Sequence, residues 1–403
     1  MKKSFFKAAL FLSLTAAFSS TAISCSDNED DTDDTTSSVD PNNFQGKIAA
    51  GTTVTLDPSK VYTITGKVLV ENGANLIIPA GTRITVAEGA NYLIVDRGGK
   101  LFVNGTASSP VVFEGTTHKQ GHWGGIVLLG NAPSNRSAAG TSTSELGDLT
   151  YGGTDNNDNS GVIKYVVIKD SGFKYNPEKE FNGLSLFGVG SGTTISYVFV
   201  TDGADDGIEC FGGSPNVDHI VVTGVGDDGF DWTEGYKGTA SFLYVARKKQ
   251  YQTNTEPGNR GIEADTQDTN ANTTFGNGAS NPTINNATFL GNTGGAESQG
   301  LKVRAGSNGK FDNIVLANYS TGLDFETDRT LTWFQSGSYV KNLKFVNVAT
   351  KSKAKNTAGT AVDISTIFTE NTAAVGAGSG TALPDWAKGW TGMSSFDTTD
   401  AMN

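Results

Sequence analysis

The chain has 403 residues and a formal net charge of −12, from 42 acidic and 30 basic side chains. This charge argues against nucleic acid and anionic lipid surfaces as partners, because both would repel an acidic protein. Glycine is abundant at 51 residues and proline sparse at 10, which favours many short strands joined by tight turns.

Residues 1–24 have the pattern of an export signal. Lysines at positions 2, 3 and 7 precede an apolar run over residues 8–17, which is too short to span a membrane. The segment ends in Ala22-Ile23-Ser24-Cys25, and a cysteine after small residues resembles the lipobox of bacterial lipoproteins. The resemblance implies cleavage before Cys25, lipidation of that residue and anchorage in the outer membrane. The alternative is ordinary secretion with an incidental cysteine.

Residues 25–44 are expected to form an acidic tether. The stretch Ser26–Asp31 is acidic and polar residues continue to Asp40, so the segment cannot bury a core and should be disordered. An acidic run beside a lipidated cysteine resembles the surface-export signal of Bacteroidota lipoproteins, which implies display on the cell surface. The alternative is a solvated linker that faces the periplasm.

Residues 45–350 show the two-residue period of short β-strands, with almost no sustained helical period. Two similar phrases, Gly73–Leu76 and Gly98–Leu101, lie 25 residues apart. The phrase Asp205–Glu209 returns 22 residues later as Asp227–Asp231, and weaker echoes follow around Gly261, Gly300 and Gly322. A period near 22 with longer intervals for loops is typical of a solenoid of short parallel strands. The sequence therefore predicts an all-β solenoid with capped ends and surface insertions.

The phase of the repeats predicts which side chains stack. The residue after each glycine should point inward, giving the ladder Leu184, Ile208, Phe230, Ile262, Leu301 and Leu323. The next residue should point outward, giving the column Ser185, Glu209, Asp231, Glu263, Lys302 and Asp324.

The outward column predicts a candidate Ca²⁺ site. Neighbouring carboxylates repel one another unless a cation or a basic residue lies between them, and Ca²⁺ takes six to eight oxygen ligands. The alternative is a solvated face, since aspartate is also common in tight turns. The candidate ligands are Asp205, Asp206, Glu209, Asp227, Asp228, Asp231 and Glu263.

Other candidate residues lie outside this column. Trp123 and Trp232 are candidates for glycan contact, whereas Cys210 is expected to be a core residue without catalytic function. Residues 351–403 are predicted to be a C-terminal extension and cap. Within it, Trp386 and Trp390 either pack down or form a carbohydrate-stacking platform.

From about residue 46 to 348, the repeated coils make the chain resemble the right-handed, single-stranded parallel β-helices of the pectate-lyase superfamily. Residues 202–208 and 211–214 also resemble the Asp-Asp block of polygalacturonase-type glycosidases. The resemblance fails at the next coil, where Gly226–Gly229 replaces the expected Gly-His-Gly block, and Lys302–Arg304 reverses the later Arg-x-Lys element. Pectate-lyase chemistry would need Ca²⁺ on the acidic cluster and a nearby basic residue.

Two functions follow from these features. The whole chain resembles the β-helix surface lipoproteins of Bacteroidota, some of which form surface layers. The first hypothesis is therefore a lipid-anchored surface protein with a structural or binding role, in a surface layer or in glycan adhesion, with glycans or copies of itself as partners and Ca²⁺ on its acidic face. The alternative is a Ca²⁺-dependent polysaccharide lyase or glycoside hydrolase acting on acidic glycans. Its candidate catalytic residues are Asp206, Asp228, Asp231, Arg260, Lys302 and Arg304.

Overall fold

A computed structural model describes residues 39–144, 149–176, 179–248, 260–267, 278–293, 297–336, 339–397 and 400. The predicted signal segment, the lipidation of Cys25 and most of the tether lie outside these residues. Within the described part of the chain, no helix has the length and apolar composition needed to cross a membrane.

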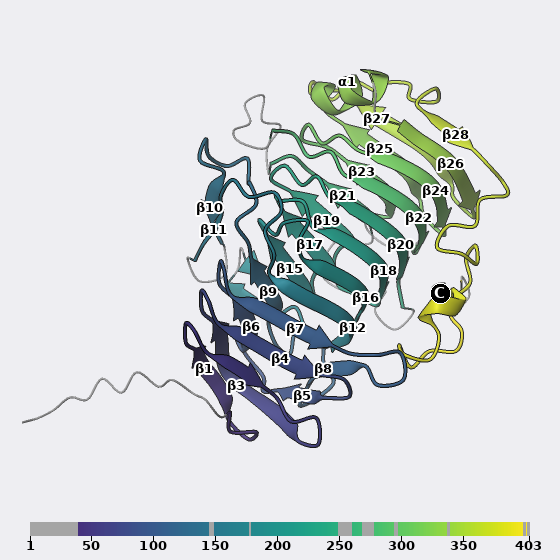
Figure 1. Ribbon diagram of the computed structural model, residues 1–403. Helices are drawn as coiled ribbons and strands as arrows, with labels where there is room; N and C mark the ends of the chain where they lie inside the picture. Colours follow the sequence, from purple (N-terminus) through teal and green to yellow (C-terminus); the bar gives the residue numbers. More distant parts are fainter. Residues whose placement is uncertain are drawn as a thin grey trace, which may run out of the picture. The chain divides into compact units, whose positions relative to one another are not determined.

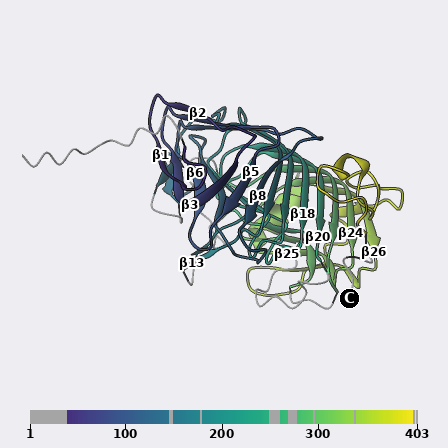
Figure 2. The same ribbon diagram turned by 90° about the horizontal axis from the view of Figure 1, so that it is seen from below.

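The described chain is a right-handed parallel β-helix, as predicted (Figure 1). Within the coils, most strands pair in parallel with strands of the coil before and the coil after, so the strands of successive coils lie side by side (Figure 2). One sheet carries the acidic column and is called the site sheet. Its strands are β1 (Phe44–Ile48), the second half of β3 (Val61–Val70), β6 (Tyr92–Val95), β9 (Gly125–Leu129), β15 (Leu184–Phe187), β17 (Ile208–Phe211), β19 (Phe230–Thr233), β21 (Ile262–Ala264), β23 (Gln299–Val303), β25 (Thr321–Glu326) and β27 (Thr350–Lys355).

The other strands close each coil. Early coils use separate short strands, and later coils use one long strand that bends at a residue with positive φ, such as His219 at 54°. The short strands are β2 (Thr53–Thr55), β4 (Asn75–Pro79), β5 (Arg83–Val86), β7 (Lys100–Asn104) and β8 (Val111–Gly115). The later strands are β12 (Gly161–Lys169), β16 (Thr194–Thr201), β18 (Asn216–Thr223), β20 (Thr239–Ala246), β22 (Thr283–Leu290), β24 (Lys310–Ala317), β26 (Tyr339–Val346) and the short β28 (Phe368–Glu370).

The core is the stacked interior of the coils, and the predicted inward ladder is confirmed. Ile208 pairs with Leu184 on one side and with Phe230 on the other, and all three side chains are buried. The glycine before each ladder residue is required sterically: a Cβ on Gly207 would lie 2.6 Å from the carbonyl oxygen of Gly229. Cys210 is fully buried, as expected for a core residue.

Two hairpins and the C-terminal segment lie outside the coils. The hairpins are β10–β11 (Thr141–Thr143 and Thr150–Gly152) and β13–β14 (Lys174–Asn176 and Lys179–Glu180). Helix α1 (Asp328–Ser336) follows β25, and the short 3₁₀ helix η2 (Asp385–Ala387) belongs to the C-terminal segment.

The C-terminal segment folds back along the side of the solenoid (Figure 1). There the Trp390 ring packs edge-on against Tyr165 and Tyr197, and the Trp386 ring packs edge-on against His219. Both tryptophans therefore pack down on middle coils of the solenoid.

Candidate functional site

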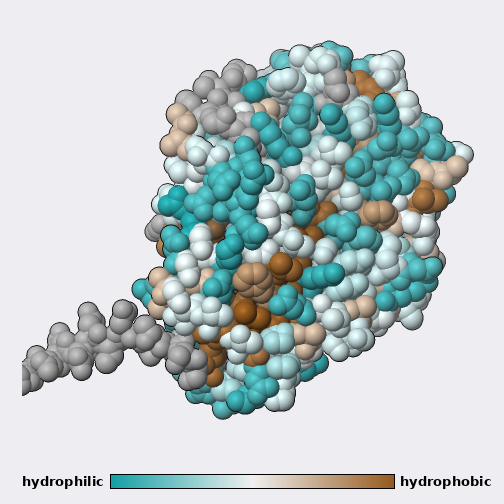
Figure 3. All heavy atoms as spheres, viewed as in Figure 1, coloured by the Kyte–Doolittle hydropathy of each residue, from teal (hydrophilic) through white to brown (hydrophobic). Residues whose placement is uncertain are grey.

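The predicted outward column forms on the site sheet. Ser185, Glu209 and Asp231 are direct neighbours in register, and Glu263, Lys302 and Asp324 continue the column. On the earlier coils the same column is apolar, with Leu69, Ile94 and Val127. These three side chains are buried in an apolar cluster. Figure 3 shows hydrophobic residues beside a hydrophilic surface on the face of the molecule seen in Figure 1.

The acidic part of the column lines a groove of about 630 Å³. Nine carboxylate residues and two arginines line it, so the groove carries a strong excess of negative charge. The nine carboxylates are Glu180, Asp205, Asp206, Glu209, Asp227, Asp231, Glu234, Glu263 and Asp265; the arginines are Arg136 and Arg304. Of the predicted ligands, Asp228 alone does not line the groove, and it is almost completely buried beside it.

Carboxylates from three consecutive coils converge in this groove. In each of three groups, one oxygen from every member lies within 4.8 Å of the others. The groups are Asp205 with Asp206 and Asp227, Asp206 with Glu209 and Asp231, and Asp228 with Asp231 and Glu263. Because Asp206 and Asp231 each belong to two groups, the three groups form one continuous cluster.

The cluster is electrostatically strained. Burial raises the pKa of Asp227 to about 6, against the opposing effect of Arg260. Burial, followed by a neighbouring aspartate, raises the pKa values of Asp228 and Glu263 to about 7. Burial and neighbouring carboxylates also raise the pKa values of Asp206 and Asp231 well above the usual range. The charged form of each of these carboxylates is therefore less stable here than in water.

The donor set fits a hard divalent cation. Among the described residues, the buried Oδ1 atoms of Asp227 and Asp231 have no hydrogen-bond partner. A buried carboxylate oxygen without a donor is costly, and a cation would satisfy it. Ca²⁺ prefers clustered carboxylate oxygens of this kind and tolerates irregular geometry. Two of the groups that line the groove could hold it: Asp206 with Glu209 and Asp231, and Asp205 with Asp206 and Asp227.

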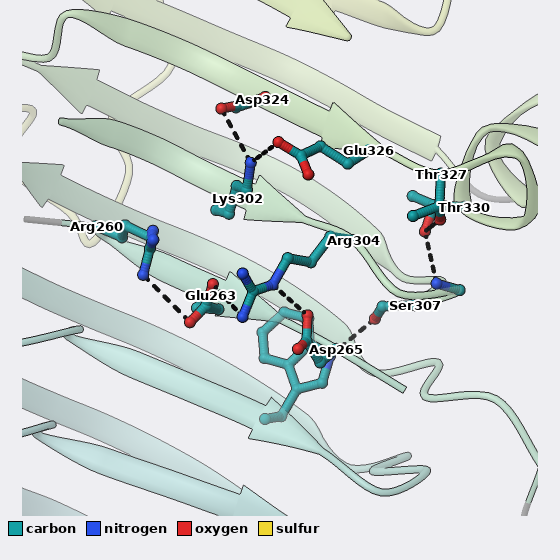
Figure 4. A network of polar contacts seen from close by, with 12 residues as sticks. Arg260, Glu263, Asp265, Lys302, Arg304, Ser307, Asp324, Glu326, Thr327 and Thr330 are labelled. Atoms are coloured by element: carbon teal, nitrogen blue, oxygen red, sulfur yellow. Dashed lines mark hydrogen bonds and ion pairs between the residues drawn. The ribbon is translucent and has the colours of Figure 1, made fainter. Parts of the chain in front are cut away.

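The three predicted basic residues are all engaged in ion pairs (Figure 4). Arg260 is 8% exposed and pairs with Asp228, Glu263 and Glu297. Lys302, which is 6% exposed, pairs with Asp324 and Glu326.

Arg304 differs from these two because it lines the groove, where it pairs with Glu263 and Asp265. Burial alone would lower the pKa of Arg304, but Asp265 and Glu263 raise it above its ordinary value. Glu263 and Asp228 act in the same way on Arg260, so both guanidinium groups are held in the charged form.

The predicted glycan contacts through Trp123 and Trp232 are wrong. Both side chains are completely buried, and their indole N–H groups donate inward, to the carbonyl oxygen of Lys169 at 2.7 Å and to Ser307 Oγ at 3.0 Å. Trp232 lies two residues after the inward-facing Phe230, so strand alternation turns it into the core. The aromatic side chains that line the groove are Tyr151, Phe187 and Phe211.

One wall of the groove comes from an insertion whose role the sequence did not reveal. Glu234, which is 4% exposed, accepts hydrogen bonds from Ser134 Oγ and Arg136 Nε, both at 2.7 Å, and from the Tyr151 hydroxyl. These contacts fix the segment that carries β10 and β11 against the coil of β19. The sequence predicted surface insertions in general, but not that this one packs against the groove.

The family described as the pectate-lyase like beta helix domain matches residues 46–391, which include the groove and most of the C-terminal segment. Neither the curated proteins nor the solved structures contain a significant match to this chain.

Proposed function

This chain belongs to the family of pectate-lyase-like β-helix domains, and on that premise we propose that it is a lipid-anchored cell-surface protein whose acidic groove binds Ca²⁺ and a glycan. The observation that carries the proposal is the cluster of carboxylates from three coils, with two buried Oδ1 atoms that lack partners among the described residues. Such a cluster is unfavourable by itself and becomes favourable with a divalent cation.

The glycan part of the proposal rests on what surrounds the cluster. Phe187 and Phe211 line the groove and stack at 4.0 Å, but they are only 1% and 7% exposed, so the polar groups of the groove supply most of the surface that a ligand can reach. A bound Ca²⁺ would offer ligand positions to the hydroxyl groups of a sugar. Adhesion to a glycan would therefore use the cation and the polar groups around it.

A surface layer built by strand pairing has less support. The described site sheet ends at β27, whose Lys351, Lys353 and Lys355 side chains are 53%, 53% and 52% exposed. Lysines on a terminal strand oppose edge-to-edge pairing with another chain.

The lipid anchor and the display on the cell surface are proposed from the sequence of residues 1–40 alone.

Glycoside hydrolysis is the second candidate. Asp227 and Glu263 line the groove with pKa values of about 6 and about 7, which suit a carboxyl group for proton donation near neutral pH. A lyase has less support, because Arg304 and Arg260 are held protonated and cannot readily act as bases, and the acidic groove would repel a polyuronate in the absence of a cation.

Retention on immobilised polysaccharides, with Ca²⁺ or with chelator, tests the proposal. The purified chain should be retained by at least one neutral polysaccharide in Ca²⁺ and released by chelator, without forming new reducing ends. Asp231→Asn should abolish retention, whereas Glu88→Gln, which removes an exposed carboxylate away from the groove, should not. New reducing ends would favour the hydrolase, and chelator-insensitive retention would contradict the proposed role of Ca²⁺.

A further inference from the structure

A second cavity, separate from the acidic groove, lies between the side of the solenoid and the C-terminal segment. Its volume is about 580 Å³. Side chains at and just after the ends of β12 and β16 form its floor, the turn containing His118 and Lys248 after β20 form its rim, and residues 391–396 with Asp400 form its roof. The cavity is within the size range of small-molecule sites.

Two opposite-charge pairs lie in this cavity. His118 Nδ1 lies 3.0 Å from Oδ2 of Asp170, whose side chain is only 3% exposed. Lys248 Nζ donates to Asp202 Oδ1 and to Thr201 Oγ1, both at 2.8 Å. The aspartates are thus held in place by partners on other turns of the chain.

The cavity also has an apolar part. Phe199 and Phe396 belong to a buried cluster that attaches the C-terminal segment to the solenoid, and Met393 packs against that cluster. The C-terminal side adds the polar side chains of Thr391, Ser395 and Asp400. The cavity therefore combines fixed hydrogen-bonding groups with carbon surface.

We propose that this cavity is a second binding site, which takes a neutral polyhydroxylated ligand such as a monosaccharide or the end of a glycan. Hydroxyl groups both donate and accept, so they can bond to the carboxylates and to the ammonium and imidazole groups without breaking their pairs. A charged ligand would have to separate an ion pair or face a like charge, on Lys169 and Lys248 or on Asp400. The apolar part matches the carbon face of a sugar ring.

The site needs both parts of the chain. His118, Asp170, Asp202 and Lys248 come from the solenoid, and Met393 and Phe396 come from the C-terminal segment. Ligand binding therefore stabilises the packing of the C-terminal segment against the solenoid, because only that packing completes the site.

The test is saturation-transfer NMR on the full chain, purified in a zwitterionic detergent so that no sugar headgroup competes. The probes are the methyl glycosides of glucose, galactose and mannose, with glucuronate and glucosamine as charged counterparts. At least one neutral glycoside should bind saturably, with an affinity about tenfold or more above that of the charged sugars. Asp202→Asn and His118→Ala should each weaken that binding by about tenfold.

Two controls separate this site from the acidic groove and from misfolding. Lys119→Ala changes an exposed residue on the same turn as His118 and should leave glycoside binding intact. Chelator, which should release a glycan from the acidic groove, should leave glycoside binding in this cavity unchanged. His118 has a 71% exposed side chain, so its replacement should not unfold the chain. Absence of binding by every neutral glycoside, or binding that survives both cavity substitutions, would overturn the proposal.

Discussion

Replacing Glu263 by glutamine should stabilise the chain when divalent cations are absent. Its carboxyl group is 12% exposed and ionises near pH 7 in the folded state, against an ordinary value of 4.5. Since one pKa unit corresponds to about 1.4 kcal/mol, the charged form costs the folded state roughly 3 kcal/mol. Glutamine resembles the neutral form and should remove most of this cost at pH 8.

The sign of the pH dependence follows from the same shift. A carboxyl group with a raised pKa in the folded state binds a proton more tightly there than in the unfolded chain. Its penalty is full above about pH 7, decreases as the pH falls, and is absent below about pH 4.5. In chelator, acidification from pH 8 to pH 5 should therefore increase the contribution of this site to stability.

Urea denaturation in chelator measures both effects. The free energy of unfolding of the Glu263→Gln variant should exceed that of the unchanged chain at pH 8, and the difference should shrink toward pH 5. Glu88→Gln serves as the control, because this exposed side chain lies outside the groove. A Glu263→Gln variant that is less stable at pH 8, or equally affected at both pH values, would refute this account of the groove.

Three further substitutions test other parts of the structure. Trp232→Ala should cost about 3–5 kcal/mol of unfolding free energy, because it empties a fully buried core position, and calorimetry of Ca²⁺ binding to the folded fraction should show little change. Glu234→Gln should weaken the charge-assisted bond to Arg136 and speed proteolysis near β10 and β11, with unchanged cleavage elsewhere as the internal control. Cys25→Ser should abolish incorporation of labelled palmitate, and persistent labelling would contradict the predicted anchor.

The fold was largely predictable because a β-helix repeats the same phase in every coil. Once Gly207 and Gly229 define that phase, Ile208 must point inward and Glu209 outward, and the observed register agrees. The same alternation places Trp232 inward. Its burial could therefore also have been predicted, because it lies two positions after Phe230 in the sequence.

The groove was only partly predictable because its walls depend on contacts between distant residues. Glu234 accepts a hydrogen bond from Tyr151, which lies 83 residues earlier in the chain. No local sequence pattern predicts that contact. The burial of Arg260 likewise depends on Asp228 of the preceding coil and on Glu297, across an interval that varies in length. The repeats determine which side chains stack from one coil to the next. The insertions determine which of those side chains are covered.

Calorimetric titration of the chelator-stripped chain with Ca²⁺ tests the central claim most directly. The clustered carboxylates predict saturable binding, accompanied by proton release near pH 6, since Ca²⁺ displaces protons from groups such as Asp227 with a pKa of about 6. Asp231→Asn should weaken this binding at least about tenfold, and Glu88→Gln should leave it unchanged. Absence of saturable binding, or equal binding by the Asp231→Asn variant, would contradict a calcium site in the groove.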